Sequence, residues 1–277
     1  MTRSGRISAQ QLRDAHGHRT CCHLCEHHCG VNRSAGELGR CRADDRARVF
    51  RHRVEYGEEL ELVPSHLFYL SGCDLRCAFC IAGANAFDPS RGTELTAEWF
   101  AEAVSWGRGQ GARNIQWVGG EPTIHLPRIL KVMSECGELP PVVWKSDFHG
   151  TPEAMDLLAG AVDVYVADFK FGNDVCARQL AGVENYLAIV TRNLKAAARD
   201  ARLIVRHLLL PGHFDCCYRP VARWMRDNLH EAAFSIREGY LPSWRAARMP
   251  GLSRPLDPAV GVEARLFAER LGLAVIE

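Results

Sequence analysis

The sequence lacks an excess of charge of either sign, and it lacks any long apolar run. Its 277 residues include 34 lysine and arginine side chains against 33 aspartate and glutamate side chains. A balanced charge gives no electrostatic argument for a nucleic-acid or anionic-membrane partner. No stretch approaches the length of a membrane span, and Met1-Thr-Arg-Ser-Gly-Arg6 has no apolar signal-peptide core. We therefore expect a soluble, cytoplasmic protein that binds neither nucleic acid nor membrane.

Cysteine, by contrast, is abundant. Twelve cysteines in a chain without a secretory signal favour metal ligation over disulfides. Five fall between Cys21 and Cys41 and three between Cys73 and Cys80. The other four cysteines are scattered along the chain, and we expect them to be buried small residues without a metal. They are Cys136, Cys176, Cys216 and Cys217. The adjacent last pair follows Pro211-Gly212, in a loop that we expect near the active face.

The distribution of apolar residues predicts an α/β fold. Residues 1–60 are rich in Arg, His and Cys, with little periodicity, and are expected to form a small metal-binding segment. In residues 61–277, buried parallel strands are expected at 67–70, 115–118, 142–144, 162–169, 203–210 and 233–236. Helices are expected at 96–106, 126–136, 152–160, 185–199, 220–229 and 257–271. Six βα units fit a partial (β/α)6 barrel better than a full TIM barrel, although an open doubly wound sheet has the same alternation.

Three cysteines follow the first predicted strand in the pattern Cys-x3-Cys-x2-Cys, namely Cys73, Cys77 and Cys80. Three thiolates on one short loop can hold three corners of a [4Fe–4S] cluster, which leaves the fourth iron without a protein ligand. An open iron can bind a substrate or cofactor, as the open position of a catalytic zinc does. A zinc knuckle or a set of buried thiols is the alternative. The loop is expected at the carboxyl edge of the sheet, where parallel α/β folds place their active sites.

Charged residues follow two later strands of the predicted sheet. The second strand ends in Gly119-Gly120-Glu121, where two glycines allow close approach of a ligand and the carboxylate can meet an ammonium group. An ordinary turn with a surface carboxylate is the alternative. The fourth strand ends with Asp168 and Lys170, which alternation places on one face. Such a pair is costly at the end of an apolar strand unless it binds a ligand or forms a salt bridge at the rim.

Arg206 is a charge inside the apolar fifth strand, so we expect it to face the interior of a barrel. A guanidinium suits bidentate capture of a carboxylate. The neighbouring His207 lies on the opposite face, where a packed or exposed histidine is expected rather than a catalytic one. Ser146 and Asp147 follow the third strand, where they can reach a cofactor or a substrate.

The N-terminal segment contains a second cysteine pattern, Cys-x2-Cys-x3-Cys-x11-Cys, formed by Cys22, Cys25, Cys29 and Cys41. Four soft ligands fit either zinc or a fully ligated iron–sulfur cluster. Cys21 could replace Cys22, and His23, His27 and His28 are additional candidates. Zinc would replace the missing core of this segment, whereas a cluster would serve electron transfer or substrate binding. A thiol-rich loop without metal is the third option.

Taken together, these motifs resemble the radical S-adenosylmethionine (SAM) superfamily. Their order from Cys22 to Pro242 resembles relatives of pyruvate formate-lyase activating enzyme that begin with a Cys-rich segment. The resemblance implies a partial barrel whose cluster is held by the three-cysteine loop and binds SAM. It assigns the amino group of SAM to Gly119, Gly120 and Glu121 and the carboxylate to Arg206. It also implies a pocket completed by Phe79 at the adenine, Ser146 and Asp147 at the ribose or substrate, and Asp168 and Lys170.

The function implied by this resemblance is reductive cleavage of SAM to a 5′-deoxyadenosyl radical, which abstracts a hydrogen atom from a protein, peptide or small molecule. Reduced flavodoxin or ferredoxin is the implied electron donor. One alternative is a non-catalytic iron–sulfur or zinc scaffold for a partner protein. Such a scaffold requires a fourth protein ligand at the three-cysteine loop, for example Cys136 or Cys216. Another is a radical SAM dehydrogenase that uses an auxiliary cluster in the N-terminal segment.

Overall fold

The computed structural model describes residues 6–277, and the chain divides into two compact units. The first unit contains the described residues up to Asp74, together with Ala84–Ser146 and Gly150–Tyr165. The second contains Leu75–Gly83, Asp147–His149 and Val166–Glu277. No helix within residues 6–277 is long and apolar enough to cross a membrane. The predicted N-terminal segment is counted with the first unit, and a boundary at residue 60 stays a prediction.

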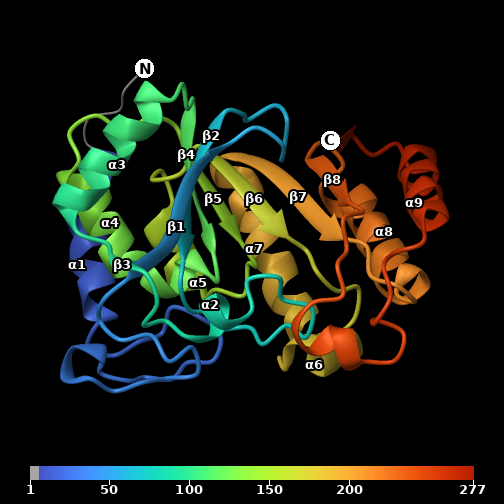
Figure 1. Cartoon of the computed structure of the whole chain (residues 1–277), viewed down its shortest axis with the longest axis horizontal. Helices are drawn as coiled ribbons and strands as arrows, with labels where there is room; N and C mark the ends of the chain where they lie inside the picture. Colours follow the sequence, from blue (N-terminus) through green and yellow to red (C-terminus); the bar gives the residue numbers. More distant parts are fainter. Residues whose placement is uncertain (1–5) are drawn as a thin grey trace. The chain divides into compact units, whose positions relative to one another are not determined.

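The first unit contains strands in the order β3-β1-β2-β4-β5. They are β1 (Arg48–Glu55), β2 (Ser65–Leu70), β3 (Thr93–Glu94), β4 (Asn114–Gly119) and β5 (Val142–Ser146). Strands β2, β4 and β5 are parallel, whereas β1 pairs antiparallel with β2 and with β3 (Figure 1). All five residues of β5 are buried, as expected for a strand covered on both faces. Only Val49 of β1 is buried and the other residues are half-buried or exposed, so β1 carries no apolar run that would have predicted it.

The helices of the first unit are α1 (Ala9–Gly17), α2 (Ala84–Phe87), α3 (Ala97–Gly109), α4 (Leu126–Glu135) and α5 (Pro152–Leu158). α4 contacts α1 and α3 in this unit. Two of these helices begin at a threonine whose hydroxyl accepts a backbone N–H, Thr96 from Trp99 and Thr151 from Ala154. The expected helices at 96–106, 126–136 and 152–160 are therefore present.

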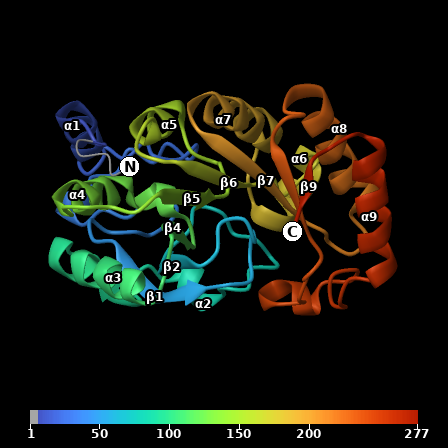
Figure 2. The same ribbon diagram turned by 90° about the horizontal axis from the view of Figure 1, so that it is seen from above.

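The second unit repeats the alternation of strands and helices. Its strands are β7 (Arg202–Leu208), β8 (Ala233–Arg237) and β9 (Val275–Ile276), and β6 (Val164–Asp168) ends in it. Its helices are α6 (Asp174–Ala181), α7 (Tyr186–Asp200), α8 (Arg219–Asn228) and α9 (Pro258–Arg270). β8 is parallel to β7 and to β9, α7 packs on β7, and α9 packs on β8 and β9 (Figure 2). Each of the six predicted runs thus forms a strand, and the predicted α/β class is confirmed.

The turn after β4 presses directly on the segment that follows β2. Gly119 has φ +130°, and a Cβ atom on Gly120 would lie 1.7 Å from the carbonyl oxygen of Gly72. The N–H of Gly120 donates to Leu70 O at 2.8 Å, and the N–H of Glu121 donates to Gly72 O at 2.9 Å. These backbone contacts require glycine at both positions, because a side chain would separate the two segments.

We predict that Gly120→Ala destabilises the protein by at least about 2 kcal/mol, because the new methyl group must displace backbone rather than a flexible side chain. Urea denaturation measures this change. Gly109→Ala, at the end of α3, is the matched control, since nothing lies within 4 Å of its added methyl group. Equal stability of the two variants would contradict the tight contact between Gly120 and Gly72.

Candidate functional site

Cys73 lies just after β2, on a segment fixed by backbone hydrogen bonds within the first unit. Ser71 N donates to Arg48 O at 2.9 Å, and Gly72 N donates to Asn85 O at 3.1 Å. Ser71 O accepts a hydrogen bond from His125 Nε2 at 2.7 Å. Burial lowers the pKa of His125 to about 4, so the ring is neutral at pH 7 and Nε2 carries the proton. The position of Cys73 is therefore set by the protein itself.

Cys77 and Cys80 lie on a segment that is fixed in the second unit. Arg76 N donates to Ala181 O at 3.0 Å and Ala78 N donates to Leu180 O at 2.7 Å. These carbonyls belong to the last turn of α6, where a helix leaves acceptors without intrahelical partners. The ring of Phe79 packs edge-on against Phe171. The segment that carries Cys77 and Cys80 is thus held by the end of a helix.

The three thiols of this loop suit a bound metal group. Cys73 and Cys77 are each 8% exposed, Cys80 is half-buried, and none forms a disulfide. Buried thiols at fixed positions are a common setting for iron–sulfur ligation. The close packing of Gly120 on Gly72 also places the Gly119-Gly120-Glu121 turn beside the start of this loop. These residues fit the predicted [4Fe–4S] group.

Glu121 and Ser146, both predicted site residues, meet in the first unit. Glu121 Oε1 accepts hydrogen bonds from Ser146 Oγ at 2.8 Å and from Thr123 N at 2.9 Å. Glu121 is 1% exposed, so the direction of its carboxylate is fixed by these donors. Thr123 was not among the predicted site residues. Its signal was local: Glu121 caps a short 3-10 turn that begins with Pro122.

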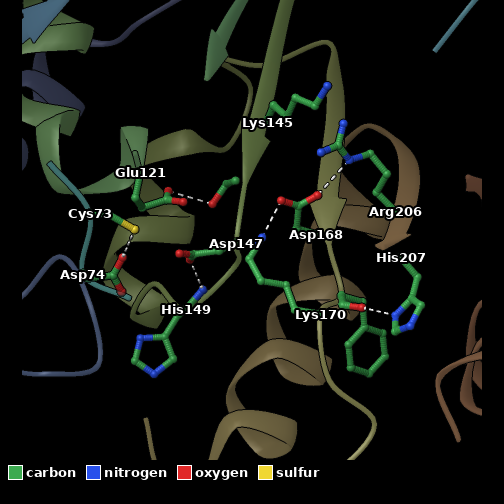
Figure 3. Close-up of polar contacts among 12 residues, drawn as sticks. Cys73, Asp74, Glu121, Lys145, Asp147, His149, Asp168, Lys170, Arg206 and His207 are labelled. Carbon is green, nitrogen blue, oxygen red and sulfur yellow. Dashed lines mark hydrogen bonds and ion pairs between the residues drawn. The ribbon is translucent and has the colours of Figure 1, made fainter. Parts of the chain in front are cut away.

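Asp168 lies between two cations in the second unit. Its Oδ2 accepts from Lys170 Nζ at 2.5 Å, and its Oδ1 accepts from Arg206 Nε at 2.8 Å (Figure 3). The N–H of Phe169 also donates to Arg206 O at 2.8 Å. Burial alone would lower the pKa of Lys170, but the nearby anions Asp168, Cys77 and Asp147 raise it above its ordinary value. Lys170 therefore stays charged, and one carboxylate orients both side chains.

Two other buried charged residues, Asp147 and Lys145, have partners that differ from those of Asp168. Asp147, a predicted site residue, accepts the N–H of His149 at 3.0 Å through its Oδ1 and is 4% exposed. Lys145, in the buried strand β5, pairs with Glu59 at 2.9 Å and Glu58 at 2.5 Å in the first unit. The only local signal of these ion pairs is a lysine inside an apolar strand, so they were not predicted. The two glutamates lie far from it in the chain.

The N-terminal cysteines differ in burial and in hydrogen-bond partners. Cys22, Cys25 and Cys41 are buried and Cys29 is half-buried. Within residues 6–277, no three of these thiols lie within 4.8 Å of one another. Cys29 Sγ accepts from the backbone N–H of Arg40, and Cys41 Sγ accepts from the guanidinium of Arg33. Zinc or a cluster in this segment stays a prediction.

His207 is packed in the second unit, as the sequence predicted. It is 1% exposed, and its Nδ1 donates to Phe169 O at 2.7 Å. Its ring also packs against Tyr218. The contacts link β7 to the chain that follows β6, so His207 has a structural role beside Asp168 and Arg206.

Three comparisons place this geometry among known proteins. The family model of the Radical SAM superfamily matches residues 67–225. An uncharacterized protein of Methanocaldococcus jannaschii is 37% identical over 261 residues, which cover 92% of this chain and 76% of that protein. Streptococcus suis SuiB bound to S-adenosylmethionine aligns at 13% identity and TM-score 0.54 over 74% of this chain and 47% of that chain. HydG, a maturase of the [FeFe]-hydrogenase, aligns at 14% identity and TM-score 0.52 over 74% and 49%.

The chain spans about half the length of these two solved structures. At such low identity the likeness concerns the fold alone. It agrees with the predicted partial TIM-like barrel, which is the fold of radical SAM enzymes.

We predict that His207 makes stability depend on pH. Burial lowers its pKa from 6.5 to about 4, against the opposing effect of its hydrogen bond to Phe169 O. Between these values the unfolded chain binds a proton that the folded chain excludes, so stability is lost as the pH falls from 6.5 to about 4. His207→Gln keeps a donor but does not titrate, so urea denaturation should show a loss shallower by up to about 1.4 kcal/mol per pH unit. The exposed His230→Gln is the control, and equal slopes for the two variants would disprove this assignment.

Proposed function

The chain belongs to the radical SAM superfamily, and from this membership we propose that it cleaves SAM reductively and abstracts a hydrogen atom from its substrate. Radical SAM enzymes use a [4Fe–4S] cluster together with SAM. The substrate classes that we propose are a protein, a peptide or a small molecule. The order of motifs supports an activating-enzyme-like role, with reduced flavodoxin or ferredoxin as electron donor.

One observation carries this proposal: the N–H of Glu121 donates to Gly72 O, next to Cys73. The contact brings the Gly-Gly-Glu turn to the first residue of the cysteine loop. In this proposal Cys73, Cys77 and Cys80 hold the cluster, and Glu121 accepts the ammonium group of SAM. When bound, the cluster and SAM supply an electron and a sulfonium bond that this electron breaks.

The remaining residues orient the cofactor in this proposal. Thr123 and Ser146 fix the carboxylate of Glu121 through the hydrogen bonds described above. Arg206 binds the carboxylate of SAM, and Asp168 holds the guanidinium through Nε. Lys170 and Asp147 add charge to the same pocket, and Phe79 contacts the adenine. Hydrogen bonds within each unit thus fix the directions of these polar groups before SAM binds.

The scaffold alternative is less well supported. A closed iron–sulfur scaffold needs a fourth ligand, for which Cys136 and Cys216 were the candidates. Cys216 lies instead beside Cys176 and His213, at 3.8 and 3.4 Å between donor atoms. Cys136 directly follows α4. A dehydrogenase with an auxiliary cluster requires metal on the N-terminal cysteines, which stays a prediction.

We predict that Cys77→Ala abolishes SAM cleavage, because the cluster loses one of three protein ligands. The measurement is 5′-deoxyadenosine formed from SAM under dithionite, by anaerobically reconstituted protein. Cys136→Ala is the matched control, since it removes a half-buried cysteine outside the loop and should retain activity. Continued cleavage by Cys77→Ala would show that the radical SAM assignment of this loop is wrong.

We predict that Asp168→Asn raises the KM for SAM at least about tenfold, a loss of about 1.4 kcal/mol, because the amide no longer orients both Lys170 and Arg206. Initial rates of 5′-deoxyadenosine formation over a range of SAM concentrations measure this. Glu184→Gln, which breaks the exposed ion pair with Arg178, is the charge-matched control. An unchanged KM in a folded Asp168→Asn variant would show that the ion pairs of Asp168 do not contribute to SAM binding.

A further inference from the structure

Four side chains with soft donor atoms converge in the second unit, outside the residues proposed to bind SAM. They are Cys176, His213, Cys216 and Cys217, and their donor atoms all lie within 4.8 Å of one another. Cys176 and Cys217 are buried, His213 is half-buried and Cys216 is exposed. An ion could therefore enter from the side of Cys216 and be enclosed by the other three. None of these cysteines forms a disulfide.

The separations match the edges of a coordination tetrahedron around one ion. With bonds of about 2.3 Å to sulfur and about 2.0 Å to nitrogen, zinc places two thiolates about 3.8 Å apart, and a thiolate and an imidazole nitrogen about 3.5 Å apart. Cys176 Sγ lies 3.8 Å from Cys216 Sγ. His213 Nδ1 lies 3.5, 3.4 and 3.9 Å from the sulfurs of Cys176, Cys216 and Cys217. We propose that these four residues form a tetrahedral Cys3His zinc site.

The local backbone explains how the donors come together. Residues Phe214–Tyr218 form a π-helical turn, with the N–H groups of Cys217 and Tyr218 both donating to His213 O. This widened turn places His213 and the adjacent cysteines on one side of the cluster of four donors. Turns of this π-helical kind are frequent at functional sites. On the other side, Cys176 lies in the first turn of α6, whose N-cap Asn173 accepts the N–H of Cys176 at 2.8 Å.

Backbone contacts press the two segments together. A Cβ atom on Gly172 would lie 2.4 Å from Cys217 O, so the loop after β6 can approach only because residue 172 is glycine. The amide of Asn173 donates to Cys216 O at 2.7 Å and to Cys176 Sγ at 3.2 Å. An N–H group directed at sulfur stabilises a thiolate, as the residues behind metal ligands commonly do. The ion would then join the loop after β6 to the loop after β7.

Two other uses of these cysteines fit the geometry less well. In an iron–sulfur cluster each cysteine binds a different iron atom, so the donors stand farther apart than those of a single ion. A disulfide between Cys176 and Cys216 requires the sulfurs at about 2.05 Å, and it would leave His213 and Cys217 unexplained. Zinc uses all four donors at their present separations.

The test is the metal content of the full chain, purified without oxygen, measured by mass spectrometry of zinc and iron. We compare Cys216→Ser and His213→Asn, which alter the two more accessible ligands, with Cys136→Ser as the control for loss of a cysteine. Cys29→Ser reports any zinc in the N-terminal segment. Zinc-edge X-ray absorption of the wild type gives the ligand set, and iron does not interfere with it.

We expect the wild type to hold one zinc that Cys136→Ser and Cys29→Ser retain, with a ligand set of three sulfurs and one nitrogen. Cys216→Ser and His213→Asn should bind this zinc more than about 100-fold more weakly, since even changes behind the ligands cost 10 to 100-fold. Equal zinc in all variants would overturn the site, and so would iron in place of zinc or a Cys176–Cys216 disulfide.

A second measurement on the wild type does not depend on the folding of variants. Alkylation followed by peptide mass spectrometry should find Cys216 protected until a zinc chelator is added. A Cys216 thiol that reacts equally fast with and without chelator would contradict the proposal. So would a metal-free wild type that takes up no zinc when zinc chloride is added.

Discussion

The contact between the backbone of Gly120 and the carbonyl of Gly72 determines how the first unit presents its polar residues. Two parallel strands, β2 and β4, end side by side, and only residues without side chains allow their following segments to touch. Through that contact the N–H of Glu121 reaches the segment that carries Cys73. The buried strands fix the two segments, and the glycines allow them to touch.

Buried and half-buried charges in the second unit are arranged around a single carboxylate. Asp168 satisfies Lys170 and Arg206 together, so neither cation depends on a ligand to be tolerated in its apolar surroundings. His207 adds a neutral contact from the opposite face of β7. The two ion pairs therefore hold both cations in fixed directions.

The main strands, most of the helices and much of the candidate site could be predicted from sequence because their signals are local. The runs that became β2, β4, β5, β6, β7 and β8 are short and apolar, and Asp168 and Lys170 share a face by alternation alone. β1 could not be found, since a strand that is partly exposed needs no apolar run.

The pairing of Arg206 with Asp168, and that of Lys145 with Glu59, could not be predicted, because long-range contacts carry no periodic signal. The same limit hid the convergence of Cys176 with His213 and the adjacent cysteine pair, whose members seemed to be scattered buried thiols.

The attachment of the segment around Cys77 to the end of α6 has a consequence for the entropy of ligand binding. Arg76 and Ala78 donate to the terminal carbonyls of α6, and Ala78 accepts from Ala246 N at 2.9 Å, so this stretch is already ordered by its own chain. Ordering a loop residue costs roughly 1–2 kcal/mol when a ligand must do it. Here folding has already met that cost. Assembly of a metal group on these thiols can therefore follow folding as a separate event, and loss of the group need not unravel the loop.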